Sequence, residues 1–287
     1  HLAVATTTPP MAEEDLTPRL ASVLGAPADA ATRTLTGSTR AGAQVLAGAL
    51  DAGPWGESGG EIGLVVVADC PRGPPDGEIE HAAGAGAAAV VLAPDAAGTV
   101  VERGSHVASY PGSRFREAGE TEATGLGITQ YDREAFTTAL GGAADGLDTE
   151  SVDAAAVQSP DGKLPYRAAR ALGVDTDTIA AAETVSQLGD TGAASAFLGA
   201  AAAYDDGAEQ LLLAAYGSGA GANAFVVDGS VPVNAALSGG ADLSYAEYLR
   251  RRGEITTGEP EGGGAYVSVP SWQRTTPQRH RLVAGRC

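Results

Sequence analysis

Three glycines at alternate positions, Gly217, Gly219 and Gly221 in the segment YGSGAGANAF, have a spacing that could bind a phosphate. The letters fit G-x-G-x-x-A, a form of the dinucleotide fingerprint, which needs a strand before it and a helix opening on it. Residues 209–216 predict a strand, but residues 223–233 alternate and carry β-branched side chains, so they predict a second strand. The glycines are therefore expected at a turn between two strands.

The reactive side chains outside this turn are few. Cys70 and Cys287 are the only cysteines, and their distance in sequence argues against a disulfide framework. Cys70 follows the apolar segment GLVVVAD, where we expect a small buried hydrophobe in preference to a nucleophile. His81 is expected to be a packed or partly exposed histidine. Lys163 is the only lysine, in a loop of a chain that otherwise uses arginine.

The composition excludes some classes of function. Asp and Glu number 36 against 18 Lys and Arg, giving a formal charge of −18, so nucleic acid is not an expected partner. Long apolar segments argue against acidic disorder, and salt would screen the repulsion within so charged a fold. We expect a cytoplasmic protein of a halophile. No signal peptide is visible, and the uncharged, apolar-leaning run at residues 191–204 is too short to span a membrane.

Strands and helices alternate along the chain. Apolar strands are predicted at 1–8, 61–70, 85–93, 98–110 and 152–159, and a strand pair at 208–227. Helices are predicted at 16–25, 39–53, 131–147, 164–174 and 191–207. Nearly continuous apolar strands indicate sheets covered on both faces, which with these helices predicts an α/β architecture. Residues 256–264 read as a linker, and the start at His1, within a strand, suggests a piece of a longer product.

Four segments, in one order along the chain, carry a family resemblance: VQSPDGKLPYRAARALG, GDTGAASAFLGAAAA, LLLAAYGSGAGANAF and YAEYLRRRGEI. Together with ADCPRGPPDGEIEHAAGAGAAAVVL upstream, they resemble archaeal 3-hydroxy-3-methylglutaryl-CoA (HMG-CoA) synthase, a thiolase-superfamily acyltransferase, from about Val4 to about Ile255. The resemblance implies a five-layer αβαβα fold of two related halves, residues 1–150, apparently incomplete, and 151–255. Each half would bury a helix between sheets.

The catalytic residues that the family needs are a cysteine, a histidine and a glutamate. The resemblance aligns Thr39 with the cysteine, beside Ser38, and aligns Gln158 with the histidine and Thr7 with the glutamate. A threonine hydroxyl is a poor nucleophile without an adjacent base, and Gln158 cannot take a proton. Ser38 and Thr39 are interpreted as helix-capping residues. Three independent replacements predict that the condensation chemistry is lost.

The substrate-binding positions of the family map onto retained or conservatively changed residues. Asp190 falls where the family has an asparagine, and the turn of Gly217, Ser218 and Gly219 would lie beside the acyl-CoA thioester. Lys163 falls in the matching loop and could meet an acyl-CoA phosphate, although a solvated loop lysine fits equally well. The resemblance implies acyl-CoA as the ligand and no other cofactor.

The tail, residues 269–287, resembles the leading segment of OB-fold proteins with a rubredoxin-like zinc ribbon that bind acyl-CoA and bridge thiolase to the synthase. Cys287 alone cannot build a four-ligand zinc site, so no metal is predicted within this chain. Residues 256–287 are expected to be a linker and the beginning of such a domain.

Three functions remain open from the sequence. The first is a non-catalytic, acyl-CoA-binding or scaffolding partner of a thiolase. The second is an active acyltransferase whose nucleophile is Ser38, Thr39 or Cys70. The third, least favoured, is a structural oligomer unconnected with CoA. The resemblance implies a homodimer in each case, formed through an edge strand near the helix at 39–53.

Overall fold

The structure is a computed structural model that describes residues 1–53, 62–255 and 268–281. The chain divides into two compact units, His1–Gly240 and Ala241–Cys287. The second unit contains helices α9 (Tyr245–Arg252) and α10 (Val269–Arg281). The predicted linker at 256–264 and Cys287 lie outside the described residues, and the predicted boundary at residue 150 stays a prediction.

The first unit contains all the strands of the described chain. Its elements are β1 (Leu2–Ala5), α1 (Thr17–Leu24), β2 (Thr32–Leu35), α2 (Ala41–Asp51), β3 (Gly63–Asp69), α3 (Glu78–Ala82), β4 (Gly86–Leu92), β5 (Thr99–Tyr110), α4 (Thr129–Ala144), β6 (Ala154–Val157), α5 (Leu164–Leu172), α6 (Thr176–Ala180), α7 (Val185–Leu188), the 3-10 helix η1 (Gly192–Ala194), α8 (Ser195–Asp205), β7 (Gln210–Gly217) and β8 (Gly219–Asp228). The predicted strands and helices are confirmed. The strand β2 and the short helices α3, α6 and α7 were not predicted, because four or five residues carry little periodicity.

The strands form two four-stranded sheets, ordered β2-β1-β3-β4 and β5-β8-β7-β6. In the first sheet β1 runs parallel to β2 and β3, while β4 runs antiparallel to β3. In the second, β6 runs parallel to β7, and β8 lies antiparallel between β7 and β5. The parallel pairs need crossovers, which α1 and α2 supply for the first sheet. β5 belongs to the second sheet, although it precedes residue 150.

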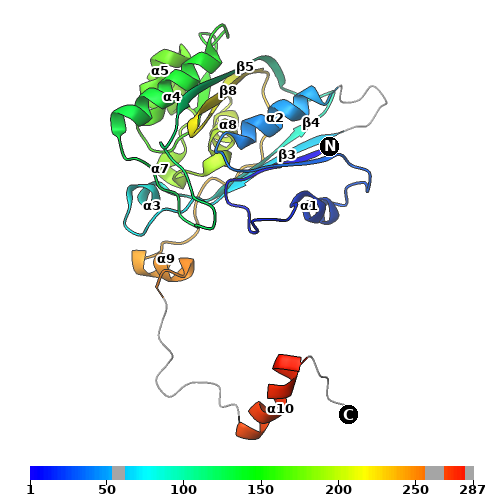
Figure 1. The fold of residues 1–287 in the computed structure, drawn as a ribbon. Coiled ribbons are helices and arrows are strands. Elements are labelled where there is room, and N and C mark those ends of the chain that lie inside the picture. Colours follow the sequence, from blue (N-terminus) through cyan, green and yellow to red (C-terminus); the bar gives the residue numbers. More distant parts are fainter. Residues whose placement is uncertain (54–61, 256–267, 282–287) are drawn as a thin grey trace. The chain divides into compact units, whose positions relative to one another are not determined.

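Helices and sheets alternate in five layers (Figure 1). α2 and α8 lie between the sheets, since α2 packs on β1, β3 and β7, and α8 packs on β4, β6 and β7. α1 packs on β1 and β2, and α4 covers the outer face of the second sheet together with α5. Small residues allow the backbones in the central layer to approach closely. At Gly42, for example, a Cβ would lie only 2.7 Å from the Ala193 carbonyl oxygen. The predicted αβαβα architecture is confirmed.

Two apolar cores hold these layers together. One fills the space between the sheets and includes Phe197 and Phe225. The other lies between the second sheet and its outer helices and includes Phe136 and Leu140. Burial of a large apolar side chain of this kind stabilises a fold by roughly 1.5–3 kcal/mol. Within the described residues, no helix has both the length and the apolar character needed to cross a bilayer.

Candidate functional site

A cavity of about 190 Å³ opens where the start of α2 meets the β7–β8 hairpin and the segments before α4 and α5. It contains four of the residues selected from the sequence, Thr39, Gln158, Asp190 and Ser218. Its lining consists of Thr39, Glu78, Ile79, Ala82, Ser113, Arg114, Asp132, Phe136, Gln158, Pro160, Asp161, Leu164, Asp190, Tyr216 and Ser218.

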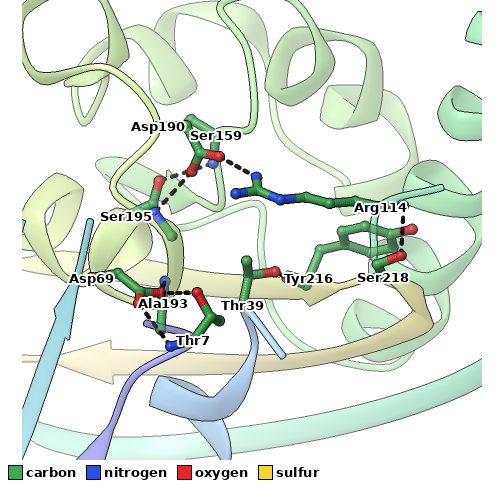
Figure 2. Close-up of polar contacts among 11 residues, drawn as sticks. Thr7, Thr39, Asp69, Arg114, Ser159, Asp190, Ala193, Ser195, Tyr216 and Ser218 are labelled. Carbon is green, nitrogen blue, oxygen red and sulfur yellow. Dashed lines mark hydrogen bonds and ion pairs between the residues drawn. The ribbon is translucent and has the colours of Figure 1, made fainter. Parts of the chain in front are cut away.

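Thr39 is held against β7. Its hydroxyl donates a hydrogen bond to the carbonyl oxygen of Tyr216 at 2.7 Å, so its proton is engaged by the backbone (Figure 2). The expected capping role is wrong for Thr39, because Arg40 occupies the N-cap of α2 and no side chain caps that helix. The Ser38 hydroxyl accepts from the Arg40 N–H at 3.3 Å, one residue before the helix, and Ser38 does not line the cavity.

Gln158 occupies the floor of the cavity with 1% of its surface exposed. Its backbone N–H continues the ladder beyond β6 by donating to the Ala214 carbonyl at 2.8 Å. Its carboxamide Nε2 and Oε1 are buried and have no hydrogen-bond partner within the described parts of the chain. A buried carboxamide without partners is rare in folded proteins and calls for an explanation.

Asp190 forms an ion pair with Arg114, a residue that the sequence analysis did not select (Figure 2). The Asp190 side chain is 3% exposed and that of Arg114 19% exposed. The other carboxylate oxygen of Asp190 accepts from the Gly192 N–H at 2.9 Å. The pair joins positions 76 residues apart, and no local pattern in a single sequence identifies such a partner.

The hydroxyl groups of Ser218, Ser113 and Tyr216 form a chain along one wall of the cavity. The Ser218 hydroxyl accepts from the Arg114 backbone N–H at 2.8 Å and lies 2.8 Å from the Ser113 hydroxyl, which lies 3.3 Å from the Tyr216 hydroxyl. Burial raises the pKa of Tyr216, and burial likewise raises the pKa of Asp132. Sequence reasoning found Ser218 but missed the other members of this wall.

The hairpin glycines have separate roles. Gly219 takes φ +92°, and Ala220 next to it also has a positive φ, so the predicted turn with left-handed residues is confirmed. A Cβ at Gly217 would lie 2.1 Å from the Ser38 hydroxyl oxygen, so this glycine makes room for the start of α2. Neither Gly217 nor Gly219 lines the cavity, and their predicted role as ligands stays a prediction.

Thr7 does not line the cavity and instead donates hydrogen bonds to Asp69. Its N–H and hydroxyl donate to the Asp69 carboxylate at 2.7 and 2.9 Å. Thr6 and Thr8 add further donors. The Ala193 N–H donates to the same carboxylate from the other half at 2.7 Å (Figure 2). Thr7 is therefore engaged with Asp69 and does not line the cavity with Thr39 and Gln158.

The remaining selected residues are not among those that line the cavity. Cys70 is exposed, so its predicted burial is wrong: the alternating burial of β3 turns Asp69 inward and the next residue outward. Lys163 is exposed, and its N–H donates to the Asp161 carboxylate at 2.6 Å, while its role as a phosphate ligand stays a prediction. His81 is partly exposed, as expected, and lies 3.0 Å from Asp76. In the described ranges, no group of three His, Cys, Asp or Glu residues could hold a metal ion.

Comparison with curated proteins identifies archaeal relatives. The chain is 30% identical over 210 residues to hydroxymethylglutaryl-CoA synthase of Pyrobaculum neutrophilum, covering 67% of this chain and 60% of that one. It is 29% identical over 210 residues to the enzyme of the same name from Archaeoglobus fulgidus, and 29% identical over 236 residues to that of Methanopyrus kandleri. The match with the Pyrobaculum protein thus spans about 60% of its length. No protein-family model matches the chain.

Solved structures of the same family share the fold. MvaS in complex with 3-hydroxy-3-methylglutaryl coenzyme A superposes with a TM-score of 0.67 at 21% identity, covering 80% of this chain and 66% of that one. An HMG-CoA synthase complexed with CoA gives a TM-score of 0.69 at 18% identity, covering 80% and 64%. The order of the motifs, the five layers and these relatives agree, and the chain belongs to the hydroxymethylglutaryl-CoA synthase family of thiolase-like proteins.

Proposed function

We propose that this protein is a non-catalytic member of its family that binds acyl-CoA and supports a partner thiolase. The observation that carries the proposal is the hydrogen bond from the Thr39 hydroxyl to the Tyr216 carbonyl, at the position where the family places its nucleophile. A hydroxyl that donates to a backbone carbonyl has no base to take its proton, so it cannot attack a thioester.

The remainder of the cavity supports the same conclusion. Gln158 stands where the resemblance requires an imidazole, and a carboxamide neither accepts nor delivers a proton at neutral pH. Among the described residues, no cysteine or histidine lines the cavity, and Cys70 is exposed elsewhere. The cavity has polar walls but, among the described residues, neither a thiol nor an imidazole in its lining, which fits binding without turnover.

The ligand follows from the relatives and the shared fold. Two structurally similar synthases are described as complexes with HMG-CoA and with CoA. We therefore propose an acyl-CoA whose acyl end enters the cavity, with Lys163 and the turn of Gly217 to Gly219 near the remainder of the molecule. The net charge of −18 fits a cytoplasm of high salt concentration, in which we propose that the protein acts as a homodimer.

Two measurements test the proposal. Calorimetric titration with acetyl-CoA should show saturable binding, while prolonged incubation should give neither free CoA nor a change in the intact mass of the protein. Affinity capture of the tagged full chain from its native lysate should retain a thiolase. A protein that binds neither acetyl-CoA nor a thiolase would contradict the proposal.

A second candidate is an active acyltransferase with a non-standard nucleophile. It is favoured by the chain of hydroxyl groups formed by Ser218, Ser113 and Tyr216 in the cavity wall. In that case acetyl-CoA would leave an acetyl group on the protein, and peptide mapping would locate it at Thr39, Ser38, Ser218 or Cys70. An unmodified protein after incubation excludes this candidate.

A further inference from the structure

We propose that the cavity around Gln158 accepts a short, uncharged acyl group and rejects acyl groups that end in a carboxylate. The inference rests on the proposed function, because it specifies which acyl-CoA the same cavity would hold. It stands on three observations: the unpaired carboxamide of Gln158, the size of the cavity, and the excess of carboxylates in its lining.

The first observation defines what the ligand must offer. Gln158 is 1% exposed, and neither Nε2 nor Oε1 has a partner in the described part of the chain. Gln158 lines the cavity, so an occupant that accepts a hydrogen bond from Nε2 would relieve the cost of burying that group without a partner. A thioester or ketone oxygen does so, and a water molecule beside the ligand can donate to Oε1.

The second observation limits the length of the ligand. The cavity measures about 190 Å³, below the roughly 300–1,000 Å³ typical of pockets for drug-sized molecules. It therefore fits an acyl chain of a few carbon atoms, while the CoA portion would remain outside.

The third observation concerns charge. Four acidic residues line the cavity, Glu78, Asp132, Asp161 and Asp190, against one arginine, Arg114, among the described lining residues. The Asp161 carboxylate accepts hydrogen bonds from two backbone N–H groups, which leave its negative charge in place. Arg114 already pairs with Asp190. A carboxylate on the ligand would thus meet three further acidic residues and no second cationic residue among those that line the cavity.

Arg114 is poorly suited to serve such a ligand instead. If its guanidinium turned to a ligand carboxylate, Asp190, with 3% of its side chain exposed, would lose its cation and keep only the Gly192 N–H. A buried carboxylate without its partner is strongly unfavourable, so the exchange would cost as much as it gains.

The experiment compares butyryl-CoA with succinyl-CoA, two thioesters of nearly the same length that differ in a terminal methyl or carboxylate. Titration calorimetry of the full chain at neutral pH should give at least tenfold tighter binding for butyryl-CoA. Asp132→Asn should raise the affinity for succinyl-CoA and so reduce the ratio of the two affinities. Gln158→Leu should lower the affinity for butyryl-CoA. Glu134→Gln, on the same helix but outside the cavity, should leave the ratio unchanged.

Equal affinities, or tighter binding of succinyl-CoA, would overturn the inference. If neither thioester binds, the proposed function is wrong, and the inference is then decided by free butyramide and butyrate. A shift of the Gln158 side-chain amide signals in the NMR spectrum with butyramide but not with butyrate would support the selection of uncharged ligands. No shift with butyramide, or a shift with both, would refute it. Circular dichroism establishes that each variant is folded.

Discussion

The carboxylate of Asp69 accepts a hydrogen bond from the backbone N–H of Ala193 at 2.7 Å, across 124 residues of sequence. Asp69 ends β3 in the first sheet, and Ala193 lies in η1, directly before the central helix α8. The same carboxylate accepts five hydrogen bonds from Thr6, Thr7 and Thr8. One buried carboxylate thus connects the end of β1 to the helix layer of the second half.

Asp69→Asn should therefore destabilise the protein strongly. The amide replaces one acceptor oxygen with a donor that faces other donors, and charge-assisted bonds become neutral ones. We expect a loss of about 3 kcal/mol in the free energy of unfolding, measured by urea denaturation. Asp175→Asn is the matched control, because its exposed side chain caps α6 and asparagine caps equally well. Similar losses in both variants would show that Asp69 has no special role.

Arg114→Met should leave the Asp190 carboxylate buried without its cation. Removal of one member of a buried pair typically costs about 3–5 kcal/mol, while loss of an exposed pair costs about 0–1 kcal/mol. The control is Arg103→Met, since Arg103 and Asp51 form a pair that is 51% and 60% exposed. Adding Asp190→Asn to Arg114→Met should recover much of the stability in thermal melts. No recovery would mean that the first variant damages packing and not charge balance.

Gly217→Ala should be destabilising in a way that depends on Ser38. The new Cβ would lie 2.1 Å from the Ser38 hydroxyl oxygen and 3.0 Å from Cγ of Arg40, so these side chains or the segment before α2 must move away from β7. We expect a cost of about 1–3 kcal/mol, the usual range for overpacking. Ser38→Gly in the same protein should restore part of the loss, and a double-mutant cycle measures that coupling. Strictly additive effects would place the strain elsewhere.

Tyr204 should give the protein a stability that declines at alkaline pH. Burial, with a smaller contribution from Asp228, raises the pKa of its phenol from 10.0 to about 12. Below pH 10 the folded and unfolded states both hold the proton; between pH 10 and 12 only the folded state does, so stability falls as the pH rises. The ring is partly exposed, so we expect a loss of roughly 1–2 kcal/mol over that range.

Tyr204→Phe should remove this part of the alkaline decline. Its hydroxyl has no partner in the described residues, so the variant should equal or exceed the wild type in stability at neutral pH. Urea denaturation of both proteins from neutral pH to pH 12 measures the difference. Parallel curves throughout would contradict the assignment to Tyr204.

The sequence predicted the helices and strands better than it predicted which of them pack together. The apolar run at 63–69 and the small-residue segment at 191–207 predict β3 and the α8 region because burial patterns are local. Thr39, Gln158, Asp190 and Ser218 could be placed in one cavity through the family resemblance. The sheet to which β5 belongs could not be predicted from the sequence. The alternation along β5 shows which of its faces is buried but does not identify the strand with which it pairs.

The missed residues share one cause. Arg114 and Asp69 act through contacts 76 and 124 residues away, and a charged residue at a strand end or in a loop looks the same whether or not it has such a partner. Cys70 was wrongly predicted to be buried because the residues before it are apolar. The alternation within β3 turns that position outward.

The membership of β5 in the second sheet has a consequence for dissecting this protein into fragments. A cut at residue 150 would separate β5 from β8, its hydrogen-bonded neighbour. Both strands would then expose an edge of unpaired backbone groups. A cut within residues 93–98, between β4 and β5, would keep both sheets whole. Two pieces made there and mixed should reassemble, whereas pieces made at 150 should aggregate.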